Sequence, residues 1–93
     1  MAEIGFDHYS GAVGERFDME VNGEALPVEL IEASPLGNSG RPGGSFRLEF
    51  LGPADPAYAQ GTFTFRRGEQ VHDIFVTAIG RDQAGTRYEA IFN

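Results

Sequence analysis

The sequence predicts an all-β fold, and three observations support this prediction. Apolar and polar side chains alternate in residues 17–22, 46–50 and 62–66. Because successive side chains of a strand point to opposite faces, this alternation is typical of half-buried β-strands. Turn-forming residues interrupt the chain at short intervals, which favours antiparallel neighbours. No segment keeps an apolar period typical of a helix, so we expect little helix.

Six strands are expected between the turns. Asn22-Gly23 is a two-residue turn of the type that needs positive φ, so it predicts a hairpin, and Arg67-Gly68 serves a second hairpin. We expect an antiparallel meander that closes into a small barrel or sandwich. The predicted strands lie near residues 16–22, 25–33, 45–51, 61–66, 71–79 and 87–92, with ends uncertain by about two to four residues.

The 93 residues are expected to form one domain. A chain of this length buries roughly 60–65 % of its unfolded surface, so a core can form without disulfides. Residues 15–93 are predicted to form the β core, and residues 1–14 to pack on it as an N-terminal segment. At most one short helical turn is expected in residues 7–15. The Gly-rich stretch 36–44 predicts a mobile loop tip.

Composition excludes several classes of function. The chain has no Cys, and all seven of its basic residues are Arg. Thiolate metal sites, cysteine nucleophiles and lysine Schiff bases are therefore impossible. A net charge of −7 repels nucleic acids and anionic membranes. The first twenty residues lack a continuous apolar run, so we expect no signal peptide and no membrane span, and hence a soluble cytoplasmic protein.

No catalytic, metal or cofactor site is expected. The chain has only two histidines, His8 and His72, whereas catalytic zinc usually takes three protein ligands. The pair His72-Asp73 is better explained as a solvated strand start than as a base with its orienting carboxylate. Asp18 and Glu20 share the polar side of one predicted strand, so we expect them to keep it solvated. The sequence therefore predicts a protein that is not an enzyme.

The last two predicted strands differ from the others because both of their faces are partly apolar. In residues 71–79, Ile74 and Val76 occupy one face, while Phe75 and Ile79 occupy the other. A strand that is apolar on both sides has to be covered on both sides, or it forms an association surface. The favoured interpretation is that the N-terminal segment covers the second face, and the alternative is that another chain does.

Five residues are the candidate partner contacts. Protein interfaces combine apolar anchors with a polar edge. On this interpretation, charging an anchor such as Val76 should abolish association and leave folding intact. The charged side chains of residues 81–89 are expected to form a cross-strand ion network rather than a contact surface. The candidate contacts are Ile74, Val76 and Ile91 as anchors, with Arg87 and Glu89 as the polar rim.

Four short motifs resemble a family of small bacterial all-β proteins of unknown function. They are GPADP at 52–56, QGTF at 60–63, GRD at 80–82 and RYEAIFN at 87–93. The resemblance covers the second half of the chain and implies no activity, cofactor or catalytic residue. The resemblance does imply that the protein is encoded near phage-tail-like proteins, and hence that it has an accessory role in such an assembly.

The sequence thus predicts a binding protein. We expect a protein–protein interaction or structural accessory module of a larger bacterial assembly, which binds either a protein partner or a second copy of itself. The alternative is a small β-barrel whose Phe-rich interior holds an apolar small molecule.

Overall fold

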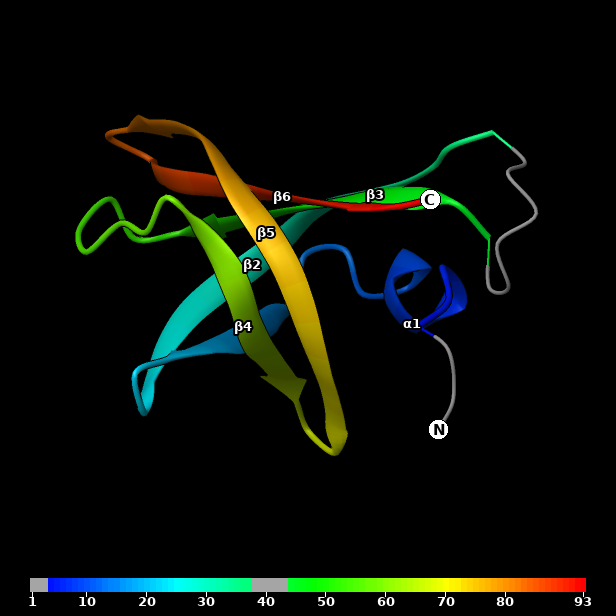
Figure 1. Cartoon of the computed structure of the whole chain (residues 1–93), viewed down its shortest axis with the longest axis horizontal. Coiled ribbons are helices and arrows are strands. Elements are labelled where there is room, and N and C mark those ends of the chain that lie inside the picture. Colours follow the sequence, from blue (N-terminus) through cyan, green and yellow to red (C-terminus); the bar gives the residue numbers. More distant parts are fainter. Residues whose placement is uncertain (1–3, 38–43) are drawn as a thin grey trace.

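The computed structural model describes residues 4–37 and 44–93, and within them six antiparallel strands close into a barrel (Figure 1). The predicted all-β class and the short N-terminal helical turn are confirmed. The tip of the predicted mobile loop, residues 38–43, lies outside the described residues. The elements are α1 (Asp7–Ser10), β1 (Arg16–Val21), β2 (Glu24–Pro35), β3 (Phe46–Gly52), β4 (Gln60–Arg67), β5 (Gln70–Asp82) and β6 (Gly85–Phe92).

The barrel consists of two three-stranded meanders joined edge to edge. The strand order is β1-β2-β3-β6-β5-β4, and the pairing of β4 with β1 closes the circle. A single six-strand meander would place β3 beside β4, whereas here β3 pairs with β6. The connection at residues 53–59 makes this order possible, because it leaves the end of β3 and returns to the barrel at the start of β4 (Figure 1).

Turn residues define the hairpins largely as predicted. Asn22 and Gly23 have φ of 52° and 83°, which confirms the positive-φ hairpin between β1 and β2. Gly68, with φ of 61°, lies in the turn between β4 and β5. The final turn is shorter than the predicted strands at 71–79 and 87–92 imply, because β5 continues to Asp82 and β6 begins at Gly85.

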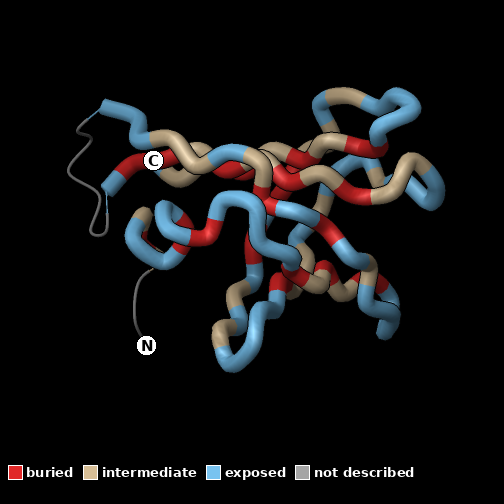
Figure 2. The backbone as a smooth tube through the Cα atoms, turned by 180° about the vertical axis from the view of Figure 1, so that it is seen from behind, coloured by how far each residue is buried: buried red, intermediate tan, exposed pale blue. Residues whose placement is uncertain are grey.

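The core lies inside the barrel and is largely aromatic. Buried and half-buried residues alternate along β3, as expected for a strand with one face in the core (Figure 2). The rings of Phe50 and Phe65 lie 4.6 Å apart, and Phe17 packs edge-on against Phe50 at 5.6 Å. Such pairs add to the stabilisation that comes from apolar burial. Side chains therefore fill the interior of the described barrel.

The N-terminal segment closes one end of the barrel. Tyr9 of α1 is fully buried and stacks on Phe17 at 5.7 Å, while Phe6 contacts Phe46 at 5.8 Å. The favoured expectation that this segment covers the outer side of the last hairpin is therefore wrong. In Figure 1, α1 lies beside one end of the barrel. There Tyr9 belongs to the core, and Phe6 packs half-buried against it. No helix among residues 4–37 and 44–93 is long and apolar enough to cross a bilayer.

Candidate functional site

Two of the predicted anchors lie inside the barrel. Ile74 and Val76 are 1 % and 0 % exposed, respectively, and both belong to the core. Their prediction as accessible contacts is wrong, because the side of β5 that carries them is the inward one. The opposite side of β5 faces solvent.

An outer apolar face takes their place, and we define it as Phe75, Ile79 and Ile91. These side chains are 56 %, 47 % and 47 % exposed. Thr77 of β5 pairs with Glu89 of β6, and Phe75 and Ile91 each lie two residues beyond this pair, on the same side of the sheet. Of the five predicted contacts, Ile91 is thus the apolar one that is accessible. The outer apolar face thus leaves three large side chains in water, and Val71, near the start of β5, is a fourth exposed apolar residue of the same hairpin.

An ion-pair network borders the outer apolar face. Arg47 of β3 lies opposite Ile91 and donates hydrogen bonds to three carboxylates. The donor–acceptor distances are 2.6 Å to Glu49, 2.5 Å to Glu89 and 3.2 Å to Glu32. The bonds to Glu49 and Glu89 raise the pKa of the Arg47 guanidinium above its ordinary value. The network thus fixes a polar edge beside Ile91.

The ion network predicted for residues 81–89 is confirmed, with one exception. Arg87 lies 3.0 Å from Asp82 and 3.6 Å from Glu49, and Glu89 is bonded to Arg47. Arg81 forms no ion pair with any residue that the structure describes. Its charge is therefore available for another role.

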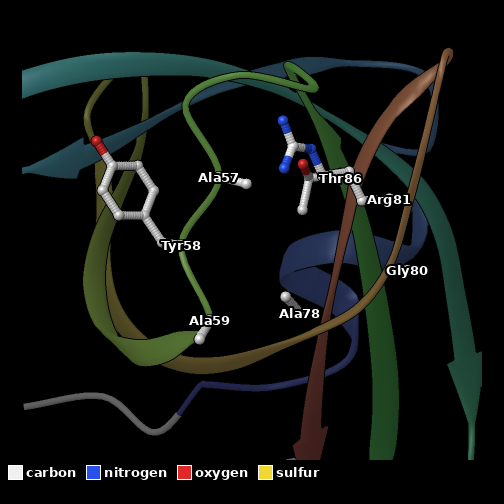
Figure 3. A pocket seen from close by; sticks show the side chains of 7 residues that line it. All are labelled: Ala57, Tyr58, Ala59, Ala78, Gly80, Arg81 and Thr86. Atoms are coloured by element: carbon white, nitrogen blue, oxygen red, sulfur yellow. The ribbon is translucent and has the colours of Figure 1, made fainter.

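A pocket of about 390 Å³ opens where the 53–59 connection passes the last hairpin. Figure 3 shows Ala57 and Ala59 on the connection, opposite Ala78 on β5. The Tyr58 ring turns to the other side of the connection and lies 6.0 Å from the Phe63 ring. The remaining lining residues are Gly80, Arg81 and Thr86. Nothing in the sequence pattern indicated this pocket, because it joins segments from three parts of the chain.

Both histidines lie at the barrel end that α1 closes. The Tyr9 hydroxyl is 2.6 Å from His72 Nδ1, and the His8 and His72 rings lie 5.1 Å apart. A neutral imidazole protonated on Nε2 accepts a hydrogen bond at Nδ1, so this contact suits an uncharged His72. Burial, followed by the charge of His8, lowers the pKa of His72. Burial also raises the pKa of Tyr9. These residues form a structural contact between helix and barrel.

Acidification is expected to weaken this contact. Because the folded-state pKa of His72 lies below the ordinary value of 6.5, the unfolded chain binds more protons than the folded chain between these two pKa values. The contribution is fully present above pH 6.5 and is lost as the pH falls toward the folded-state pKa. Because the ring is partly exposed, we expect the free energy of unfolding to drop by less than about 1 kcal/mol between about pH 7 and pH 5.

Urea unfolding at several pH values measures this effect. The matched control is His72→Asn, which keeps a polar side chain beside Tyr9 but does not titrate. Its free energy of unfolding should vary less over the same pH range. An equally steep decline in the variant would assign the pH dependence to other groups.

The carboxylates that could suggest catalysis are engaged on the surface. Asp18 pairs with Arg16 at 3.2 Å, and Glu20 pairs with Arg66 at 3.0 Å. Asp73 accepts a hydrogen bond from the Thr64 hydroxyl across β4 and β5. In the described part of the chain, no three His, Asp or Glu side chains gather in a way that could hold a metal ion.

Comparison with known proteins places the chain in a family. One family model, described as a domain of unknown function (DUF6916), matches residues 4–92. The match includes α1 and all six strands. Comparisons with the curated proteins and with the solved structures give no significant match. The predicted membership of an uncharacterised family is confirmed at this level, and the chain belongs to the DUF6916 family.

Proposed function

We propose that this protein is a non-enzymatic interaction module that docks on a partner protein through the outer apolar face. The observation that carries the proposal is the exposure of Phe75, Ile79 and Ile91 on one hairpin. A chain of this length has little apolar surface to spare, and contiguous exposed apolar side chains are typical of association surfaces. Burying them against a partner would remove them from water.

The border of this face also suits an interface. Arg47 and Glu89 are held together at 2.5 Å, and Arg87 is held by Asp82 at 3.0 Å. Their side chains lose little further freedom on binding, because the network already fixes them. The predicted rim residues Arg87 and Glu89 would then lie at the edge of the contact, around an apolar centre.

We place the module in a larger bacterial assembly, as an accessory of a phage-tail-like structure, and in the cytoplasm. The family resemblance supports the kind of assembly, and a chain without Cys suits a reducing compartment. The alternative function, a barrel that holds an apolar molecule in its interior, has less support. Phe17, Phe50 and Phe65 occupy that interior with ring separations of 4.6–5.6 Å.

Site-specific cross-linking in the native cell tests the proposal. A photo-reactive phenylalanine analogue at Phe75 should give a discrete covalent adduct, because this position lies in the centre of the proposed contact. The matched control carries the same analogue at Glu24, which is exposed in the β1–β2 hairpin. An adduct of doubled mass would identify a second copy of the chain as the partner. The absence of adducts at Phe75, or equal adducts at both positions, would refute docking through this face.

A further inference from the structure

A β-bulge in β5 turns Arg81 toward the pocket beside the 53–59 connection. Ala78 packs against the core, and after the bulge Arg81 pairs with Thr86, a buried residue of β6. In an unbroken strand, Ala78 and Arg81 would point to opposite faces, because they are three positions apart. The extra residue, Ile79, brings them to the same side. In Figure 3 the Arg81 and Thr86 side chains both point toward the connection that carries Ala57.

The pocket holds two polar groups that the described residues leave unused. Thr86 is 1 % exposed, and its hydroxyl has no hydrogen-bond partner. A buried polar group without a partner is costly, so a site that leaves one in place invites a ligand atom or a water molecule. Arg81 has no paired carboxylate, because its neighbour Asp82 is bonded to Arg87 and to the Ala84 amide. A cation and a hydroxyl thus border the same hollow.

Hydrogen bonds hold the apolar wall of the pocket in place. The Ala78 amide donates to the Ala59 carbonyl oxygen at 2.6 Å. The Tyr58 amide donates to the hydroxyl of Tyr88, whose side chain is fully buried, at 3.1 Å. The connection is therefore tied both to β5 and to the core. A wall that is already ordered reduces the entropy that a ligand loses on binding.

We propose that this pocket binds a carboxylate attached to a small apolar group. A guanidinium pairs with a carboxylate through two parallel hydrogen bonds, and Thr86 adds a hydroxyl beside it. The methyl groups of Ala57, Ala59 and Ala78 form a wall that suits a short branched alkyl group. The lining residues supply one cation, which matches a singly charged carboxylate better than a phosphate dianion. The volume of 390 Å³ lies within the range of about 300–1,000 Å³ that is common for small-ligand sites.

Two sources offer this chemistry, a free short-chain acid and the C-terminal carboxylate of a chain that ends in an apolar residue. The pocket shares no lining residue with the outer apolar face. Carboxylate binding in the pocket can therefore be tested separately from protein docking on the outer apolar face. If one proposal fails, the other still has its own test.

Titration followed by amide NMR shifts tests the proposal with both sources. The probes are isovalerate and acetyl-alanyl-leucine, each compared with its neutral amide, at concentrations up to about 20 mM. Either carboxylate should shift the amide signals of residues 57–59, 78–81 and 86, and should bind at least about ten-fold more tightly than its amide. A response to isovalerate alone would identify a free acid as the ligand, and a response to the peptide alone would identify a chain terminus.

Three variants distinguish a specific carboxylate-binding site from a pocket that holds only water. Arg81→Gln should weaken binding by at least about ten-fold, because the charged hydrogen bonds are lost. Thr86→Val should also weaken binding, yet leave the folded state equally or more stable, because it replaces an unpartnered hydroxyl with a methyl group of similar size. Arg67→Gln removes the same charge at the β4–β5 turn and should bind like the parent. Equal binding of acid and amide, or shifts in none of these signals, would overturn the proposal and leave water as the pocket's occupant.

Discussion

Replacing Gly85 with alanine is expected to remove most of the protein's stability. Gly85 has a φ of 141°, which side-chain-bearing residues rarely adopt, and a Cβ atom there would lie 2.1 Å from the carbonyl oxygen of Gly52. That oxygen belongs to the backbone of β3, where Gly52 pairs with Thr86 of β6. It can move only if the two strands separate. The pairing of β3 with β6 joins the two halves of the barrel, so a clash at Gly85 destabilises the whole barrel.

The expected cost is comparable to the total stability of a small domain. Backbone strain at such a φ costs about 1–3 kcal/mol, and the steric overlap adds to it, so we expect a loss of about 4 kcal/mol or more. Total stabilities of natural domains are about 5–15 kcal/mol. Urea unfolding followed by far-UV circular dichroism measures the loss. The matched control, Gly11→Ala, has an ordinary φ of −93° and open space at Cβ, so its stability should change by less than about 1 kcal/mol. A similarly small change for Gly85→Ala would mean that β3 and β6 do not approach so closely.

The strands and hairpins follow from local sequence. Alternation in residues 46–50 defines β3, and Asn22-Gly23 supplies the backbone conformation of the first turn. Strand order does not follow in this way. The pairing of β3 with β6 depends on how the 53–59 connection crosses the barrel, and no local pattern specifies that path.

The placement of α1 was also beyond local sequence. Phe6 and Tyr9 could pack on any exposed apolar surface of the barrel. The position of α1 depends on where their aromatic side chains are most fully enclosed. The open barrel end offers Phe17 and Phe46 as stacking partners. The outer side of β5 exposes Phe75 and Ile79 at the surface of the barrel, so the helix packs at the end and Phe75 stays in water.

The side of β5 that points into the core could have been predicted from the polar residues within its apolar segment. Asp73 and Thr77 lie on the same side of the strand as Phe75. Two polar residues on that side indicate that it faces solvent. The large apolar residues on both sides concealed this signal. A shift of one residue exchanges the two faces of a strand, so the error moved Ile74 and Val76 together from the core to the surface. The bulge at Ile79 gave one hint in the sequence, since Gly80 inside a strand often marks a bulge.

Val76→Asp is expected to disrupt folding and Phe75→Asp to disrupt partner binding, although the two residues are adjacent. Val76 is fully buried in the barrel, and its immediate core neighbour on the same side of β5 is Ile74. The described core around Val76 consists of apolar side chains, so a carboxylate there would lack a counter-charge, and an uncompensated buried charge costs about 3–5 kcal/mol. Val76→Asp should therefore abolish the cooperative unfolding transition or shift it to much lower urea concentration. This reverses the result expected if Val76 were an interface anchor.

Phe75→Asp should keep the fold and lose the partner. Phe75 is 56 % exposed and faces Thr62 across the β4–β5 pair, so a carboxylate remains hydrated there, and the stability should change by less than about 1 kcal/mol. On a docked apolar face, the same carboxylate would be desolvated without a counter-charge, which opposes association. Combining Phe75→Asp with the cross-linker at Ile91 measures this, because the adduct formed from Ile91 in the parent should disappear. An adduct that persists in a folded Phe75→Asp protein would show that the partner contacts Ile91 without covering β5, and the docking face would then have to lie on β6 and β3.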